Sequence, residues 1–267
     1  KRDVAVKVIS REWLSCLEND EEEVEIALCR FEREVHAMAG IRHPNVLQIY
    51  DYGSEEIKED GGETREIQYI AMEFIPGNTL RATMSDLGFD PEEDLTRSWL
   101  KDYFFPVLDG LEAIHKRGMV HRDIKPENVL MDDRVPKIAD FGLVSSCKMR
   151  AVTQSVDLKG TVMYMPPEQF MDFRHTDVRG DIYSLGKILY EAVVGKIGSK
   201  DKALHFKAVG LDEPESPFFE ELDRILRKST AEEKDERYKS VLELKNELLE
   251  AMAIPENATD EPMQNRP

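Results

Sequence analysis

Two acidic side chains and one amide lie close together near the middle of the chain, in a pattern suited to metal-assisted chemistry. Asp123 and Asn128 fall within residues 121–128 (HRDIKPEN), and Asp140 opens the triplet 140–142 (DFG) at the end of a predicted strand. Carboxylate and amide oxygens are ligands that Mg²⁺ prefers, and a carboxylate beside them can orient a hydroxyl nucleophile. Phosphoryl transfer needs mainly that orientation and a neutralised phosphate. The pattern therefore predicts a site for phosphoryl transfer.

The elements that must position these residues fall into two groups, and the first group is rich in strands. Residues 4–9, a β-branched run before Ser10, predict a strand buried on at least one face. Apolar residues at three- and four-residue steps predict a helix that ends at Gly40, with Glu34 on the flank of its stripe. These residues are Leu28, Phe31, Val35 and Met38. Two or three more strands are predicted between about 46 and 74, interrupted by an acidic, solvated loop at 55–66.

The second group is helical and begins after Pro76 and Gly77, where the boundary between two lobes is predicted. A long amphipathic helix is expected first, with a kink or local adjustment at Pro106. Its apolar positions are Leu100, Phe104, Val107, Leu108, Leu111 and Ile114. A hairpin of two short strands, 129–131 and 135–139, and further helices follow. The predicted domains are a first lobe at 1–75, a second at 76–252 and a disordered tail at 253–267.

The composition excludes several classes of partner. At 267 residues and 41% hydrophobic content, the chain can bury one large core or two lobes sharing a cleft. A formal net charge of -18 repels nucleic acid and anionic lipid, so we expect neither nucleic-acid binding nor membrane contact by this segment. Three widely spaced cysteines and no bilayer-length apolar run favour a cytoplasmic location. The chain does not begin with Met, so a longer parent protein, with a membrane anchor elsewhere, is compatible with it.

In order and spacing, the motifs resemble the catalytic domain of eukaryotic-type serine/threonine protein kinases, from residue 4 to about 252. The Pro-Pro-Glu-Gln run ending at Gln169 is similar to bacterial members. The resemblance implies an α+β, two-lobed fold with a small, mostly antiparallel-sheet N-lobe and a larger helical C-lobe. It also implies ATP and Mg²⁺ as cofactors, protein substrates, and dimerisation as a route to trans-autophosphorylation.

The same resemblance assigns roles to individual residues. Asp123 would be the catalytic base, and Asn128 and Asp140 would hold the magnesium ions. Lys125 would touch the γ-phosphate. Lys7, in the strand at 4–9, would engage the α- and β-phosphates, with Glu34 as its ion-pair partner.

The run 72–77 (MEFIPG) is similar to the hinge between kinase lobes. Met72 would then guard the back of an adenine pocket, and backbone groups of Glu73 and Ile75 would pair with the purine. Ala5 and Leu130 would form the roof and floor of an apolar slot. Taken singly, all five could equally be ordinary core residues.

Residues 142–168 resemble an activation segment. Thr153 and Ser155 are candidate phosphorylation sites, because a phosphate there could pair with Arg122, although a merely polar loop is as good an explanation for either one. Thr161 matches a threonine that would position Asp123 and Lys125, and Lys125 with residues 160–161 favours serine/threonine over tyrosine specificity. Two scaffold contacts are also implied. They are an ion pair between Glu168 and Arg237, and a brace from Asp181 to the backbone of residues 121–122.

One part of the family pattern is missing, because only six residues precede Lys7 and no glycine-rich phosphate loop occurs. The N-lobe is therefore expected to be truncated, which would leave the strand at 4–9 with an exposed pairing edge. Two alternatives to a protein kinase stay open at this point. A kinase-fold scaffold or ATP-binding module with impaired catalysis would fit the missing loop, and phosphate transfer would discriminate it. A small-molecule kinase is disfavoured by the activation segment.

Overall fold

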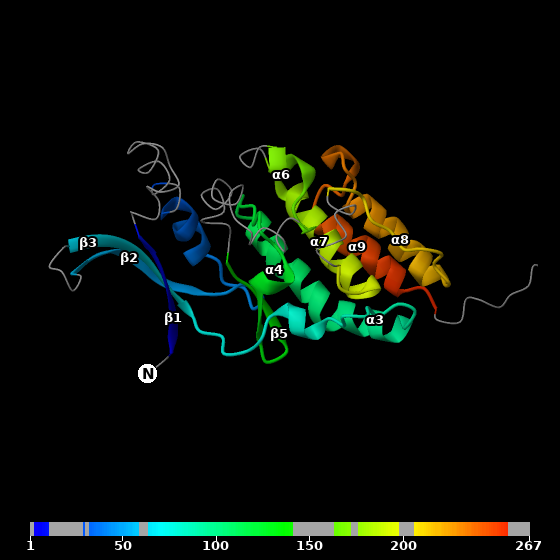
Figure 1. Ribbon diagram of the computed structural model, residues 1–267, viewed down its shortest axis with the longest axis horizontal. Helices are drawn as coiled ribbons and strands as arrows, with labels where there is room; N and C mark the ends of the chain where they lie inside the picture. Colours follow the sequence, from blue (N-terminus) through cyan, green and yellow to red (C-terminus); the bar gives the residue numbers. More distant parts are fainter. Residues whose placement is uncertain are drawn as a thin grey trace, which may run out of the picture.

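A small antiparallel sheet lies beside a larger group of helices in the computed structural model (Figure 1). The structure describes residues 3–10, 29, 32–58, 64–140, 163–171, 176–197 and 206–255. Within these ranges, no helix combines the length and apolar character needed to cross a bilayer. The predicted combination of a small sheet and a larger helical part is confirmed.

The sheet has three strands in the order β1-β3-β2. Both β1 (Val4–Ser10) and β2 (Ile49–Lys58) run antiparallel to β3 (Thr64–Glu73). The acidic loop predicted at 55–66 is wrong in extent, because β2 and β3 stay paired from Glu55↔Ile67 to Lys58↔Thr64. Backbone hydrogen bonds hold the two strands together even where their side chains are solvated, so a run of charged residues does not by itself indicate a loop. Residues 59–63 lie outside the described part.

Strand β1 is the edge of the described sheet and is less buried than predicted. Val4, Val6 and Val8 are about half exposed, and no side chain described in β1 is fully buried. Because alternate residues face opposite sides, Ala5 and Lys7 share the other, partly covered face. The expected burial is missing because that second face carries a charged lysine, and within the described residues only β3 pairs with β1.

The first helical residues follow the predicted stripe. Residues 32–39 are helical, Val35 and Met38 are buried, and Gly40 lies in the turn that follows, as predicted. Of the other stripe residues, Leu28 and Phe31 lie outside the described ranges.

The long helix of the second lobe is confirmed, with an adjustment just before Pro106. Helix α3 (Glu93–Trp99) continues through a π-helical turn at Leu100–Phe104 into α4 (Phe105–His115). Proline lacks the backbone N–H that an α-helix would donate to residue 102, and a π-turn accommodates that gap. All six apolar positions predicted for this helix are buried.

The remaining elements alternate between short turns and helices. The 3-10 helices are η1 (Leu80–Thr83), η3 (Pro126–Asn128) and η8 (Lys234–Glu236), and the hairpin is β4 (Val129–Asp132) with β5 (Val135–Ile138). The further helices are α6 (Pro167–Met171), α7 (Val178–Val194), α8 (Pro217–Ser229) and α9 (Val241–Met252). The side chains of Asp177, Ser216 and Ser240 cap the N-termini of α7, α8 and α9 by accepting backbone N–H bonds.

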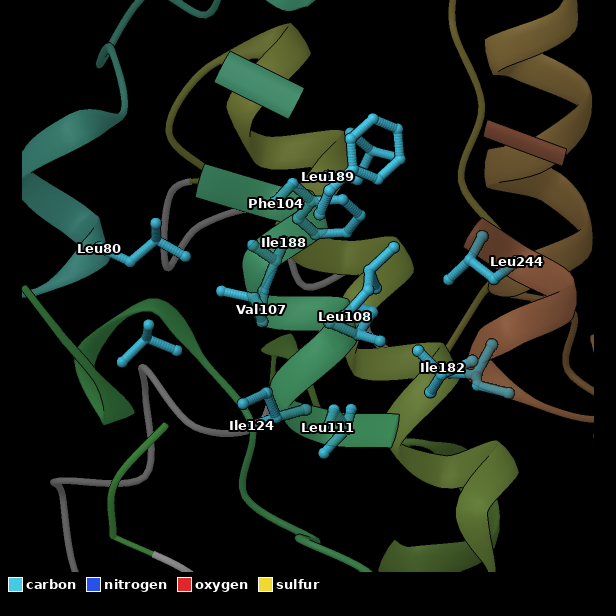
Figure 2. Packing of buried hydrophobic residues seen from close by; sticks show 14 of the residues in the cluster. Leu80, Phe104, Val107, Leu108, Leu111, Ile124, Ile182, Ile188, Leu189 and Leu244 are labelled. Atoms are coloured by element: carbon cyan, nitrogen blue, oxygen red, sulfur yellow. The ribbon is translucent and has the colours of Figure 1, made fainter. Parts of the chain in front are cut away.

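Helices α4 and α7 form the centre of one continuous hydrophobic core. Figure 2 shows side chains of α4 (Val107, Leu108, Leu111) close to those of α7 (Ile182, Ile188, Leu189). The same cluster includes Val35 of the 32–39 helix and Ile70 of β3, so it spans both lobes. Helix α8 packs against α7, and α9 packs against α8 and α4; both lie on the far side of α7 from the sheet (Figure 1).

Two adjacent leucines of α9 provide a test of this packing. Leu248 is 0% exposed and Leu249 is 47% exposed. We expect Leu248→Ala to lower the free energy of unfolding by about 3 kcal/mol, because it leaves a cavity in the core. Leu249→Ala is the matched control and should cost less than about 1 kcal/mol. Urea denaturation measures both, and equal losses would contradict the described orientation of α9.

Candidate active site

Two predicted catalytic residues and one predicted magnesium ligand lie close together in the loop at 121–128. The side-chain amide of Asn128 donates to the backbone oxygen of Asp123 at 2.6 Å and to its carboxylate at 3.0 Å. The ammonium of Lys125 lies 3.2 Å from the other carboxylate oxygen. Helix η3 delivers Asn128 to the start of β4, which fixes its direction toward Asp123. The Asp123 carboxylate is therefore oriented by an amide and a cation.

The backbone of this loop is held by Asp181, as predicted. One carboxylate oxygen of this fully buried residue accepts the N–H of His121 at 2.8 Å, and the other accepts that of Arg122 at 2.7 Å. The ring Nε2 of His115 makes a further hydrogen bond to this carboxylate at 2.7 Å. Burial alone would raise the pKa of Asp181, but the hydrogen bonds from His115 and from the backbone N–H of His121 outweigh it and lower that pKa. These bonds also hold Arg122 at a φ of 66°, in the left-handed region.

His121 connects the loop to the chain just before Asp140. Its Nε2 lies 3.0 Å from the backbone oxygen of Ala139, and its Nδ1 accepts the backbone N–H of Asp123 at 3.3 Å. A neutral imidazole that carries its proton on Nε2 satisfies both contacts. Burial lowers the pKa of His121, which favours this neutral form. The ring thus fixes Asp123 relative to Asp140.

Across the gap between the lobes, Lys7 of β1 forms an ion pair with Asp140. Glu34, the predicted partner of Lys7, lies 3.5 Å from the guanidinium of Arg122. Each end of the predicted Lys7–Glu34 pair is thus engaged with another residue, and that pair stays a prediction. Lys7, Glu34, Asp140 and the loop at 121–128 nevertheless meet in one region.

The hinge is connected to the second lobe by a salt bridge that sequence reasoning missed. Lys137 of β5 donates to the carboxylate of Glu73 at 2.5 Å and lies 3.3 Å from Asp132. Burial would lower the pKa of Lys137, but its bonds to Glu73 and Asp132 raise it. The backbone N–H of Glu73 also donates to Gln48 at 2.9 Å. Glu73 is thereby fixed from both lobes at the end of β3.

The other residues of the predicted adenine slot lie on strands around this hinge. Ala5 pairs in register with Met72, and Leu130 lies in β4, where it forms a bridge with Thr79. Gly77 must stay a glycine, because a Cβ there would lie 2.1 Å from the backbone oxygen of Met131. Ile75 lies between β3 and this close approach. The slot itself stays a prediction.

The donor set fits a magnesium ion. Asn128 uses its amide nitrogen for Asp123, so its oxygen is the atom that can serve a cation. Asp140 supplies a half-exposed carboxylate. Both are hard oxygen ligands of the kind that Mg²⁺ selects.

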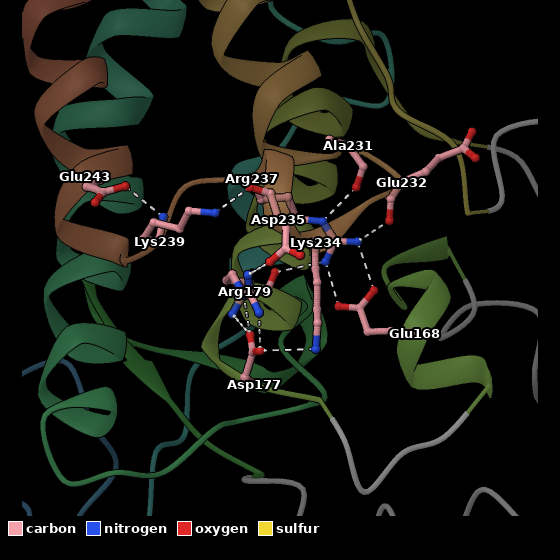
Figure 3. Close-up of polar contacts among 10 residues, drawn as sticks. All are labelled: Glu168, Asp177, Arg179, Ala231, Glu232, Lys234, Asp235, Arg237, Lys239 and Glu243. Carbon is pink, nitrogen blue, oxygen red and sulfur yellow. Dashed lines mark hydrogen bonds and ion pairs between the residues drawn. The ribbon is translucent and has the colours of Figure 1, made fainter.

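The end of the predicted activation segment, at Glu168, is anchored by an ion pair with the fully buried Arg237 (Figure 3). Arg237 donates to the two oxygens of Glu168 at 2.7 and 2.9 Å, which confirms the predicted pair. Its guanidinium also donates to the backbone oxygens of Ala231, Glu232 and Arg179. Gln169, which sequence reasoning missed, ties the same helix α6 to the loop by donating to the oxygen of Arg122 at 2.7 Å. Thr153, Ser155 and Thr161 lie outside the described residues, and their roles stay predictions.

Comparison with known proteins decides the family. The sequence model of a protein family, described as the protein kinase domain, matches residues 1–254. The chain belongs to the protein kinase family. A probable serine/threonine-protein kinase PknB of Bifidobacterium longum is 34% identical to this kinase chain over 275 residues, which cover 98% of the chain and 38% of the relative. Serine/threonine-protein kinase PknL of Mycobacterium tuberculosis is 31% identical, covering 96% and 61%.

Solved structures confirm the two-lobed kinase fold. The PknI kinase domain of Mycobacterium tuberculosis, solved as a mutant, superposes with a TM-score of 0.60 at 23% identity, over 93% of this chain and 84% of that one. A structure titled PpkA-294 apo form gives 0.58 at 23% identity, over 86% and 78%. The chain spans less than two thirds of the length of the curated relatives cited above, 38% and 61%.

The Glu168–Arg237 pair gives this kinase domain a measurable stability contribution. Arg237→Met should lower the free energy of unfolding by about 3–5 kcal/mol, because it leaves the partly buried Glu168 carboxylate and three backbone oxygens without their donor. Arg224→Met is the matched control, since Arg224 holds Glu221 and Glu247 on an exposed surface. That change should cost less than about 1 kcal/mol. Thermal or urea unfolding compares them, and a small loss for Arg237→Met would refute the anchoring role.

Proposed function

We propose that the protein containing this chain is a serine/threonine kinase that transfers the γ-phosphate of ATP to hydroxyl groups of protein substrates. The observation that carries the proposal is that four side chains meet where the sheet faces the loop at 121–128, called the catalytic loop from here on. They are Lys7, Asp140, Asp123 and Asn128. A cation that can hold phosphates, two oxygen ligands for a metal and a carboxylate for a hydroxyl proton are the groups that phosphoryl transfer uses.

Asp123 is the proposed base. Its carboxylate is oriented by Asn128 and Lys125, so one acceptor hydroxyl can approach in a defined geometry. Lys125 then lies where it can also neutralise the γ-phosphate. Asn128 and Asp140 would hold Mg²⁺, which when bound neutralises the phosphate charge and stabilises the leaving oxygen.

The nucleotide would lie against the hinge. Backbone groups of Glu73 and Ile75 would pair with adenine, with Ala5, Met72 and Leu130 around the ring. The Glu73–Lys137 bridge supports this placement, because it fixes the hinge residue relative to β4 and β5. Proteins of the cytoplasm are the proposed substrates, and a second copy of the same kinase is one of them.

Phosphate transfer tests the proposal directly. The full-length protein and its Asp123→Asn variant are incubated with Mg²⁺, labelled ATP and histone as a generic basic acceptor. We expect the variant to lose activity by about a hundredfold or more, because an amide cannot accept the hydroxyl proton.

The matched control is Asp133→Asn, in the exposed turn between β4 and β5, where asparagine also tolerates the positive φ of 54°. It should label histone like the wild type. Equal labelling by Asp123→Asn and wild type would remove Asp123 from its role. ATP binding without any transfer by the wild type would favour the scaffold alternative.

Glu34 supplies a second test. We propose that it leaves Arg122 and pairs with Lys7 when the nucleotide is engaged, since Arg122 and the Lys7–Asp140 pair lie within the same region. Glu34→Gln should therefore lower kcat/KM for ATP by about tenfold or more through the loss of charge beside Lys7. Glu32→Gln, an exposed change on the same helical segment, is the control and should have no effect. Steady-state kinetics at varied ATP decides, and an unchanged kcat/KM in Glu34→Gln would disprove the exchange.

A further inference from the structure

Arg81 binds side chains from three other parts of the fold at once. It lies in η1, just after the hinge. Its Nε donates to Glu127 of the catalytic loop at 2.9 Å, and its Nη1 lies 2.8 Å from Glu191 of α7. Its Nη2 donates to the hydroxyl of Tyr164, which itself donates to Glu191. No role of Arg81 follows from the catalytic assignments above.

Two of these contacts are explained by stability. Glu191 is only 4% exposed, and a buried carboxylate needs a cation and hydrogen bonds to remain charged. Arg81 and Tyr164 supply both. Burial and the neighbouring Glu191 raise the pKa of Tyr164, so its hydroxyl stays protonated and able to donate.

The third contact has no such explanation. The Glu127 side chain is 48% exposed, so water could solvate its carboxylate without any help from Arg81. Glu127 lies directly before Asn128, whose amide orients Asp123. Tyr164 lies in the short turn before Pro166 and α6. The planar guanidinium of Arg81 contacts both Glu127 and Tyr164. It therefore fixes the catalytic loop relative to the chain that leads into α6.

We propose that Arg81 is a positioning residue: through Glu127, it aligns the catalytic loop with the turn at Tyr164 that leads into α6. This alignment sets the efficiency with which the kinase phosphorylates its protein acceptor. This inference rests on the proposed kinase function. An acceptor hydroxyl must reach Asp123 from the surface on which the acceptor chain lies. Small misalignments between the hydroxyl and Asp123 lower the reaction rate strongly. Lys7 and the hinge are held by other contacts, so ATP binding does not depend on Arg81.

A double-mutant cycle tests the coupling in the full-length protein. Arg81→Met, Glu127→Gln and the double variant are assayed for kcat/KM toward histone and for KM toward ATP. Each single change should lower kcat/KM for histone about tenfold. The double variant should show the same loss as each single variant, because both changes remove the same Arg81–Glu127 contact. The KM for ATP should stay within about twofold. Full activity of the single variants, or losses that multiply in the double variant, would overturn the proposal.

A second pair of variants separates positioning from stability. Arg81→Met leaves Glu191 buried without its cation and should lower the thermal midpoint, whereas Arg81→Met with Glu191→Gln should recover it. The activity toward histone should stay low in both. Recovery of activity together with the midpoint would show that Arg81 is only structural. Arg224→Met, an arginine that holds two carboxylates far from the loop, should leave the kinetics unchanged.

Hydrogen exchange gives a readout that does not need phosphate transfer. The N–H of Asn128 donates to the backbone oxygen of Lys125 at 3.0 Å, and its exchange reports on the conformation of the loop. It should be faster in Arg81→Met and in Glu127→Gln than in the wild type. Unchanged exchange would refute the coupling. A wild type that does not label histone at all would refute the kinase assignment instead, and the exchange data would still decide the role of Arg81.

Discussion

The buried carboxylate of Asp181 is the interaction on which the rest of the site depends. A charge at zero exposure must be paired and hydrogen-bonded, and Asp181 achieves this with the backbone N–H groups of residues 121 and 122 and the imidazole of His115. The loop cannot move without breaking those bonds. The hydrogen bonds of His121 to Asp123 and to Ala139 then connect this fixed loop to the chain just before Asp140.

The two lobes meet through contacts of different strength. The hydrophobic core is continuous from Ile70 to α7, and a parallel bridge joins Val46 to Ile138. Glu73 and Lys137 add an ion pair with little exposure at the hinge. The groups proposed to handle phosphate are Lys7 on β1 and Lys125, Asn128 and Asp140 in the other lobe.

The sequence predicted those features whose signal is local, and it missed those set by distant neighbours. Periodicity located α4, and proline chemistry predicted the disturbance that appears as a π-turn at 100–104. The motifs predicted the Asp181 brace and the Glu168–Arg237 pair. Charge wrongly predicted a loop over strands paired up to Lys58, because backbone pairing does not depend on side-chain charge. The contacts of Lys137 with Glu73, of Gln169 with Arg122 and of Arg81 were missed since they join residues 46 to 110 positions apart in the chain, and no spacing rule marks them.

Exposure separates the permanent part of the site from the part that can rearrange. Asp181 and Arg237 are fully buried, so breaking their hydrogen bonds would leave uncompensated charges in the core. Lys7–Asp140 and Glu34–Arg122 join side chains that are 26–53% exposed, and ion pairs of that kind contribute only about 0–1 kcal/mol. Exchanging those partners for one another, for a metal or for phosphate therefore costs little. The loop at 121–128 can therefore stay fixed while Lys7 and Glu34 exchange their ion-pair partners.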